Sequence, residues 1–366
     1  MELLPVIWFV LLGFIIAMYA ALDGFDLGVG IVYPFLAKDE EEKRILLNSI
    51  GPVWDANEVW LILAGGALFA AFPVAYATLQ SGLYLPVILI LFMLILRAIG
   101  IDYRGKMPTP ALKKTMDMVF FLGSLGVTFL FGLTLGNVIK GLPVKLVEKE
   151  LYGEVVKTHM ICADQDCSYT GLLINILDPY ALLVALLTVS FVAMHGAIYA
   201  AYVTNGDLSH RAASLAKKLW FNSALLYLIV HILTMIYHPL LIKNYFTRMF
   251  IFPALPIVIV AFITIIVALN RQKYSLAFWS STAMIFSAIG IAFASIYPTL
   301  VPSIYDENPF ENPVHSITVF NSASSEKTLL TMLIIALIGV PMVLTYKFFV
   351  YRIFWGKVKV PKEGGY

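Results

Sequence analysis

Two carboxylate pairs and one arginine are the residues whose types and spacing best suit proton chemistry. Asp23 and Asp26 stand three positions apart, and Asp55 and Glu58 repeat this spacing. Residues three apart share one face of a helix. Arg97 is the only charged residue in a long apolar stretch. Because carboxylates gathered around an arginine and supplied with water can pass protons, the sequence predicts a proton path through these five residues.

A structural interpretation of the same residues stays open. The carboxylates could cap helix ends and lock helix packing, with the glycines of Asp23-Gly-Phe-Asp-Leu-Gly-Val-Gly30 as points of close helix contact. Trp54 and Trp60 are amphipathic aromatic residues of the kind expected at a membrane–water interface. We expect Trp54, Asn57 and His195 to support the cluster, and we predict no catalytic residue and no metal ligand in this chain.

Three histidines lie in apolar segments, where each could be an axial haem ligand. His195 is in one such segment, and His231 and His238 are seven apart on another, so that they share a helical face. The alternative is a histidine that is hydrogen-bonded between helices. Since no pair has a spacing that demands a metal, we predict that this chain binds no haem.

The composition places these residues in a membrane. Hydrophobic residues make up 60% of the 366 residues and charged residues only 13%, and the mean hydropathy is +0.86. A soluble domain carries roughly 25% charged residues. These values exclude a soluble enzyme, a disordered chain and a secreted disulfide scaffold, and a formal charge of +2 argues against nucleic acid as a partner.

The apolar segments predict nine membrane-spanning helices, since each crossing needs about 20 apolar residues. The stretch 59–101 is interpreted as two helices, because Pro73 and the Gln80-Ser81-Gly82 segment interrupt it. We expect the first segment to be a span, because it lacks the basic start of a signal peptide. The remaining charge-free runs are 3–22, 118–139, 179–206, 219–242, 249–270, 274–305 and 328–346.

The positive charges predict the orientation of these spans. Of the 25 Lys and Arg residues, seventeen fall on one side and seven on the other, with Arg97 inside a span. We therefore expect the N-terminus outside and the C-terminus in the cytoplasm. Residues 1–366 then form a single membrane domain with long outer loops at about 140–177 and 298–327. Cys162 and Cys167 fall in the first loop, on the oxidising side, where a disulfide is expected.

Several blocks of the sequence, taken together, resemble subunit II of cytochrome bd-type quinol oxidases. The resemblance covers essentially the whole chain and is most specific in the first hundred residues. The blocks are Asp23-Gly-Phe-Asp-Leu-Gly-Val-Gly30, Asn48-Ser-Ile-Gly-Pro-Val-Trp-Asp-Ala-Asn-Glu-Val-Trp-Leu-Ile62, Gly65-Gly-Ala-Leu-Phe-Ala-Ala-Phe-Pro73, Leu96-Arg-Ala-Ile-Gly-Ile-Asp-Tyr-Arg104, Met194-His-Gly-Ala and Thr204-Asn-Gly-Asp-Leu-Ser-His-Arg211.

The resemblance implies an all-helical subunit of nine transmembrane helices, built as two four-helix bundles and one peripheral helix. It implies a partner, subunit I, which carries haem b and haem d and the quinol-oxidising loop, and a small single-helix accessory subunit. The complex would oxidise quinol (ubiquinol or menaquinol) and reduce O₂ to water with protons from the cytoplasm, in a bacterial or archaeal cytoplasmic (inner) membrane.

The resemblance also bears on individual residues. Asp55 and Arg97 match positions associated with a proton path between subunits, and Asp23 and Asp26 match the acidic motif of the first helix. A different class, a proton- or ion-coupled secondary transporter, would also need intramembrane carboxylates and broken helices. The sequence shows no paired inverted half-repeat, and co-isolation with a haem-bearing partner would separate the two.

Overall fold

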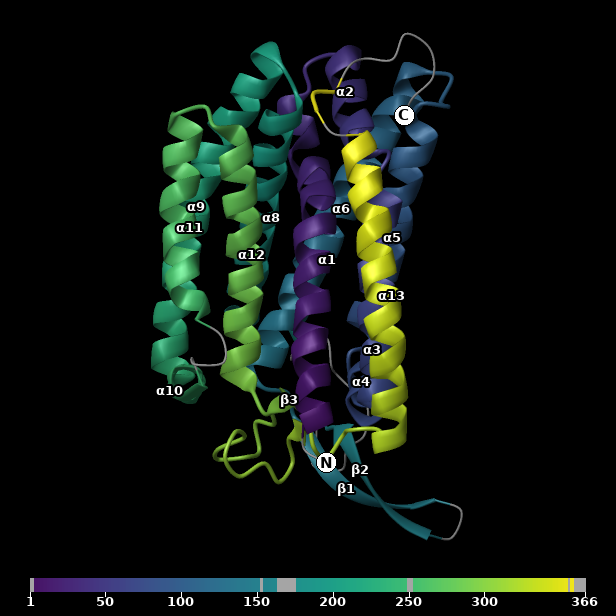
Figure 1. Cartoon of the computed structure of the whole chain (residues 1–366), viewed down its shortest axis with the longest axis vertical. Helices are drawn as coiled ribbons and strands as arrows, with labels where there is room; N and C mark the ends of the chain where they lie inside the picture. The colour runs from purple at the N-terminus through teal and green to yellow at the C-terminus, as the bar shows by residue number, and fades with distance from the viewer. Residues whose placement is uncertain (1–2, 152–153, 163–175, 249–252, 355, 359–366) are drawn as a thin grey trace.

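The computed structural model describes residues 3–151, 154–162, 176–248, 253–354 and 356–358. Within them the chain forms twelve helices and two small antiparallel sheets (Figure 1). The helices are α1 Leu3–Leu36, α2 Glu40–Ile50, α3 Trp54–Ala71, α4 Pro73–Gly82, α5 Tyr84–Arg104, α6 Pro110–Lys140, α8 Pro179–Val203, α9 Gly206–Tyr237, α10 Pro239–Arg248, α11 Ala254–Asn270, α12 Tyr274–Ile296 and α13 Glu326–Ile353. The strands are β1 Val144–Leu151, β2 Glu154–Ile161, β3 Thr299–Val301 and β4 Ile317–Thr318.

Helix α1 is much longer than the predicted first span. The boundary at residue 22 was wrong, because the helix runs unbroken for 34 residues, through Asp23 and Asp26, to Leu36. At about 1.5 Å per residue, Asp23 lies about 30 Å from the start of α1 and about 20 Å from its end. The two carboxylates therefore lie well inside a helix, where both are buried, and not at a glycine-rich helix end.

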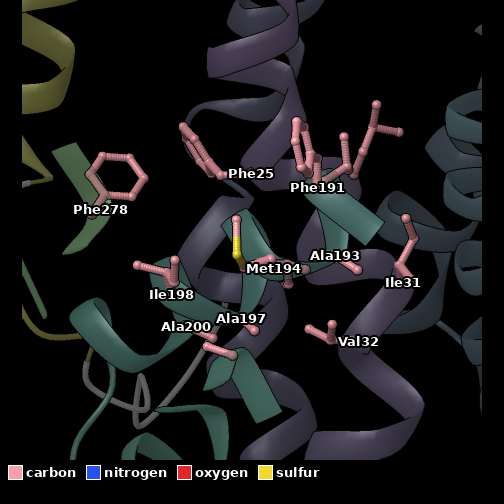
Figure 2. Packing of buried hydrophobic residues seen from close by; sticks show 14 of the residues in the cluster. Phe25, Ile31, Val32, Phe191, Ala193, Met194, Ala197, Ile198, Ala200 and Phe278 are labelled. Carbon is pink, nitrogen blue, oxygen red and sulfur yellow. The ribbon is translucent and has the colours of Figure 1, made fainter. Parts of the chain in front are cut away.

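Helix α1 lies at the centre of the molecule, with helices packed on both sides (Figure 1). Helices α8, α9, α11 and α12 form one group, α3, α5 and α6 lie on the other side, and α13 runs along the outside. Phe25 of α1, Met194 and Ile198 of α8 and Phe278 of α12 belong to the buried core, on the side where α1 packs against the first group (Figure 2).

The stretch 59–101 breaks at both predicted places, but it forms three helices and not two. Helix α3 ends at Ala71, α4 begins at Pro73, and α5 begins at Tyr84. Phe72 leaves the helical conformation (φ −134°, ψ 64°), because a residue before proline is pushed out of the helical region. The axes of α3 and α4 differ by 119°.

Seven of the described helices are long and apolar enough to cross a membrane, and eight are if the bent pair α3–α4 counts as one span. Helix α11 is apolar but has only 17 residues. The chain is therefore a multi-pass membrane protein. The count of nine spans and the orientation of the termini stay predictions.

The two predicted outer loops contain strands. In the first, β1 and β2 pair as a hairpin with Val144 opposite Ile161, and in the second, β3 pairs with β4. Both sheets lie at the end of the molecule where α1 begins (Figure 1). Cys162 directly follows β2 and is buried. Cys167 lies outside the described residues, so the Cys162–Cys167 bond stays a prediction.

Candidate functional site

Arg97 of α5 and Asp23 of α1 form a fully buried ion pair. The two terminal guanidinium nitrogens of Arg97 donate to Asp23, one to Oδ1 at 2.6 Å and the other to Oδ2 at 3.0 Å, and neither side chain is exposed. Two donors in a fixed fork match the two oxygens of a carboxylate. Close packing of α5 on α6 positions the arginine: a Cβ on Gly123 would lie 2.6 Å from the backbone nitrogen of Arg97.

Glu58 of α3 is a second acceptor for the same guanidinium. Its Oε1 accepts a hydrogen bond of 2.8 Å from Arg97, and 24% of its side chain remains exposed. Arg97 therefore links a fully buried carboxylate to one that reaches the molecular surface. The Trp54 ring lies 5.8 Å from Cζ of Arg97. Trp54 and Trp60 are both buried, so they pack inside the protein, and their depth relative to a membrane–water interface stays a prediction.

Asp26 belongs to a neighbouring hydrogen-bond network, centred on Asn57 of α3. The Asn57 amide nitrogen donates to Oδ2 of Asp26 at 2.7 Å and to the carbonyl of Leu22 at 3.2 Å. Its amide oxygen accepts from Lys347 at 2.8 Å and from the Tyr351 hydroxyl at 2.9 Å. Asn57 thus uses all of its donors and acceptors, and it connects α1, α3 and α13.

Asp55 does not reach Arg97, contrary to our expectation. It is exposed, and among the described residues no side chain forms an ion pair with it. Glu58, one helical turn further along α3, makes that contact instead. Asp55 therefore lies at the surface beside the cluster. The structure brings together Asp23, Asp26, Glu58, Arg97 and Asn57, with Trp54 against the guanidinium.

His195 lies in the helix core, and both of its ring nitrogens are engaged. Nε2 lies 3.1 Å from the carbonyl of Ala21, and Nδ1 lies 2.7 Å from the Ser281 hydroxyl. Because a carbonyl only accepts, Nε2 carries the proton, and Nδ1 faces the Ser281 hydroxyl, which also lies 2.8 Å from the carbonyl of Phe278. This is an interhelical contact between α1, α8 and α12, and it leaves no nitrogen of His195 for a haem iron.

Of the other two histidines, only His231 lines a cavity. His231 donates through Nδ1 to the carbonyl of Tyr227 at 2.9 Å, and it lines a mostly apolar cavity of about 170 Å³ between α8, α9 and α12. The ring of His238 lies 5.0 Å from that of Tyr180. Within the described residues, no three His, Cys, Asp or Glu side chains could hold a metal ion together.

A second charged cluster near α2 was missed by the sequence analysis. Asp117 of α6 accepts from Arg104 at 2.5 Å, from Lys43 at 2.8 Å and from the Tyr33 hydroxyl at 2.8 Å, and Arg104 also pairs with Glu40 at 3.0 Å. These contacts tie α1, α2, α5 and α6 together. From the sequence, Lys43 and Arg104 are only two of the seventeen cations of the predicted cytoplasmic side. The signal was Asp117 itself, the acid that bounds the charge-free run 118–139.

Lys347 and Tyr351 were also missed. Both come from the last helix, and the sequence places Lys347 among the seventeen cations of the predicted cytoplasmic side. The structure instead buries it beside Asn57. A lone lysine at the end of an apolar run carries no sequence signal that separates these two placements.

Comparison with known proteins gives one consistent result. A family model described as cytochrome bd terminal oxidase subunit II matches residues 4–354. The chain is 30% identical over 391 residues to cytochrome bd-I ubiquinol oxidase subunit 2 of Escherichia coli, covering 98% of this chain and 96% of that protein. It is 29% identical over 359 residues to cytochrome bd ubiquinol oxidase subunit 2 of Bacillus subtilis, covering 96% of each.

The fold is similar to that of a solved structure. A chain of the bd oxidase from Geobacillus thermodenitrificans superposes with a TM-score of 0.70 and 19% sequence identity, covering 96% of this chain and 99% of that chain. The likeness extends over nearly the full length of both chains.

Proposed function

The chain belongs to the family of cytochrome bd terminal oxidase subunit II, and we propose that it is the subunit of an electrogenic quinol:O₂ oxidoreductase that carries protons without itself holding haem. The relatives from Escherichia coli and Bacillus subtilis are both subunits of ubiquinol oxidases. The observation that carries the proposal is the buried Asp23–Arg97–Glu58 cluster, because an intramembrane ion pair that opens to the surface is costly to maintain without a function.

A haem-bearing subunit I is the partner in this proposal. Haem b and haem d in that partner would supply the electron transfer and O₂ reduction, with quinol as the reductant and a small accessory subunit as a further component. The residues of this chain support that division, since His195 has no free ring nitrogen. Asp55 is an exposed carboxylate beside a cluster that lies deep among the helices. Because an ionisable group at that depth is costly against lipid, we infer that a neighbouring subunit covers Asp55.

The proposed proton path starts at Asp55 and continues through Glu58 to Asp23 and Asp26. Glu58 is partly exposed, so it can exchange a proton with water at the subunit boundary. Arg97 stays charged and holds the Glu58 and Asp23 side chains in place at 2.8 and 2.6 Å. A proton that neutralises one carboxylate is thus passed on by groups that are already positioned, which keeps reorganisation small.

The protein would act as a single multi-pass domain in the bacterial inner membrane, taking protons from the cytoplasmic side. A secondary transporter has no specific support. The family model and both relatives cover nearly the whole chain and name oxidase subunits.

The test is the Asp55→Asn substitution in the complete complex. Asn keeps the shape and polarity but cannot titrate. We expect normal assembly and haem spectra, with most of the quinol-driven O₂ consumption or membrane potential lost, and more activity retained by Asp55→Glu. Glu41→Gln, which neutralises an exposed carboxylate of α2, is the control and should behave as wild type. Wild-type turnover and potential in Asp55→Asn would refute the path.

A further inference from the structure

Lys347 is an unusual residue on an otherwise peripheral helix. Most side chains of α13 point away from the protein, and Leu329 and Lys347 are its buried residues. Only 6% of Lys347 is exposed. A lysine ammonium inside a membrane domain is costly and marks a functional position by default.

The Lys347 ammonium is held by neutral acceptors. It donates to Oδ1 of Asn57 at 2.8 Å and to the carbonyl of Ala56. Asn57 in turn donates to Asp26 at 2.7 Å. The ammonium therefore lies one amide group away from a buried carboxylate, close enough to act on its charge but without a direct ion pair. An amide does not release a proton readily, so Asn57 separates the two groups while fixing their geometry.

The cluster contains more acidic than basic side chains. With all groups ionised, Asp23, Asp26 and Glu58 carry three negative charges, and Arg97 and Lys347 carry two positive ones. A net charge in a buried site is strongly disfavoured, so one proton on one carboxylate balances the cluster. Without Lys347 the same balance would require two protons.

Asp26 is the carboxylate best placed to hold that proton. Both oxygens of Asp23 accept from Arg97, and Glu58 accepts from Arg97 and is partly exposed. Asp26 is fully buried, its Oδ2 accepts from an amide, and its Oδ1 has no hydrogen-bond partner among the described residues. The titratable or charged groups around it are Asp23 of α1, Glu58 of α3, Arg97 of α5, Tyr199 of α8, and Lys347 and Tyr351 of α13.

We propose that Lys347 is a positioning residue of the proton path: its ammonium, held by Asn57 beside Asp26, supplies the second positive charge of the cluster and limits it to one exchangeable proton, which Asp26 carries. The inference rests on the proposed function, since the proton is the one that the path delivers. It gives α13 a role in the chemistry as well as in the packing.

Infrared difference spectroscopy of the complete complex tests this proposal as a function of pH. The wild type should show the carbonyl band of one buried carboxylic acid, and Asp26→Asn should abolish it. Lys347→Gln keeps an N–H donor near Asn57 but removes the charge. Its carbonyl absorption should grow toward that of two buried carboxylic acids and persist to a pH about one unit higher, because loss of a nearby opposite charge makes a carboxylate hold its proton more firmly. Lys347→Arg should match the wild type.

A matched control is Lys357→Met. The Lys357 ammonium donates to the carbonyls of Thr204 and Ala201 at 2.6 and 3.5 Å, so it is also tethered to neutral oxygens, but away from the acid cluster. Its loss should leave the band unchanged. If Lys347→Gln does not assemble, Lys347→Met gives the same readout. The proposal would be overturned if the carbonyl band survived in Asp26→Asn, or if the pH dependence of the band were unchanged in Lys347→Gln and Lys347→Met. A wild-type complex that showed no quinol-driven O₂ uptake would instead refute the oxidase function.

Discussion

Arg97 is the residue on which the candidate site depends most. It is fully buried, it donates to two carboxylates from different helices, and the Trp54 ring covers it. A buried ion pair adds little stability over an apolar pair, but removal of one partner leaves an uncompensated charge. The cost of losing Arg97 therefore falls mainly on Asp23, for which Arg97 is the charged partner among the described residues.

We predict that Arg97→Ala destabilises the protein by about 3–5 kcal/mol, the usual cost of breaking a buried pair. Arg97→Lys should recover only part of this, because an ammonium lacks the two-pronged donor geometry. The measurement is the yield of assembled complex and its thermal midpoint in detergent. Arg271→Ala, at an exposed position beyond α11, is the control. Equal yields for the Arg97 and Arg271 variants would contradict the prediction.

At the level of helices, α1 and α8 approach each other through two glycines. A Cβ on Gly28 would lie 2.2 Å from the carbonyl oxygen of Val192 and 2.7 Å from Cα of Gly196. These are backbone atoms, which do not move aside as a flexible side chain does. The glycine-rich motif that follows Asp23 therefore has a packing role, as the structural interpretation of the sequence expected. Asp23 and Asp26 belong to the same helix, so this close contact also fixes the helix that carries them.

We predict that Gly28→Ala forces α1 and α8 apart and destabilises the protein by about 1–3 kcal/mol, the usual cost of overpacking. Gly65→Ala is the matched control, because it is also a helical glycine and a Cβ there meets nothing within 4 Å. Alanine at that position should be neutral or slightly stabilising. Thermal unfolding of the two variants gives the comparison, and a Gly28→Ala midpoint at or above that of Gly65→Ala would exclude this account.

The β1–β2 hairpin contacts the second predicted outer loop next to a half-buried histidine, His159. The backbone N–H of Leu146 donates to Nδ1 of His315 at 3.2 Å, and Leu146 is paired across the hairpin with His159. Burial lowers the pKa of His159, and the neighbouring His315 lowers it further, while Asp306 raises it. The folded hairpin thus favours the neutral form of His159.

We therefore predict that acid loosens this hairpin. The unfolded state binds the proton first as the pH falls through about 6.5, the ordinary histidine pKa, so stability decreases below that value and is retained above it. Hydrogen exchange of β1 and β2 at pH values on either side of 6.5 is the measurement. His159→Gln should reduce the pH dependence. If the amides of β1 and β2 in the wild type were equally protected from exchange at both pH values, the prediction would be wrong.

The sequence predicted helix breaks better than helix lengths. Pro73 ends α3 for a local reason, since its effect on Phe72 needs no partner. The end of α1 was misplaced because Asp23 and Asp26 interrupt the apolar run, and their burial depends on Arg97 and Asn57, which are distant in sequence. Lys347 was missed for the same reason. Local chemistry is visible in one segment, whereas the pairing of a buried charge depends on which helices meet.

At the scale of the whole molecule, the two ends differ in character. The hairpin and the β3–β4 sheet gather where α1 begins, and α2 lies at the opposite end, as does the end of α13 (Figure 1). Helices α1 and α13 therefore run in the same direction. Two parallel terminal helices require an odd number of crossings between the ends of the chain, which is compatible with nine spans if α3–α4 and α11 both count.

The charge asymmetry supports one orientation of this arrangement. Two of the seventeen cations assigned to the cytoplasmic side, Arg104 and Lys347, are buried inside the protein and carry no weight in a loop count. Fifteen cations then remain on the side of α2 and seven on the opposite side, which is still a large excess on the side of α2. We predict that the hairpin lies outside the cell membrane and that α2 lies in the cytoplasm.

Single added cysteines test this orientation. Glu148 of the hairpin and Glu41 of α2 are both exposed, so Glu148→Cys and Glu41→Cys place matched thiols at opposite ends. A membrane-impermeant maleimide should label the Glu148→Cys protein in intact spheroplasts and the Glu41→Cys protein only after permeabilisation. The chain without an added cysteine gives the background labelling. The reverse pattern would invert the topology. It would also place the α2 end outside and deprive the proposed path of its cytoplasmic proton supply, because the Asp55–Glu58 cluster lies nearer to that end of α1 than to the hairpin.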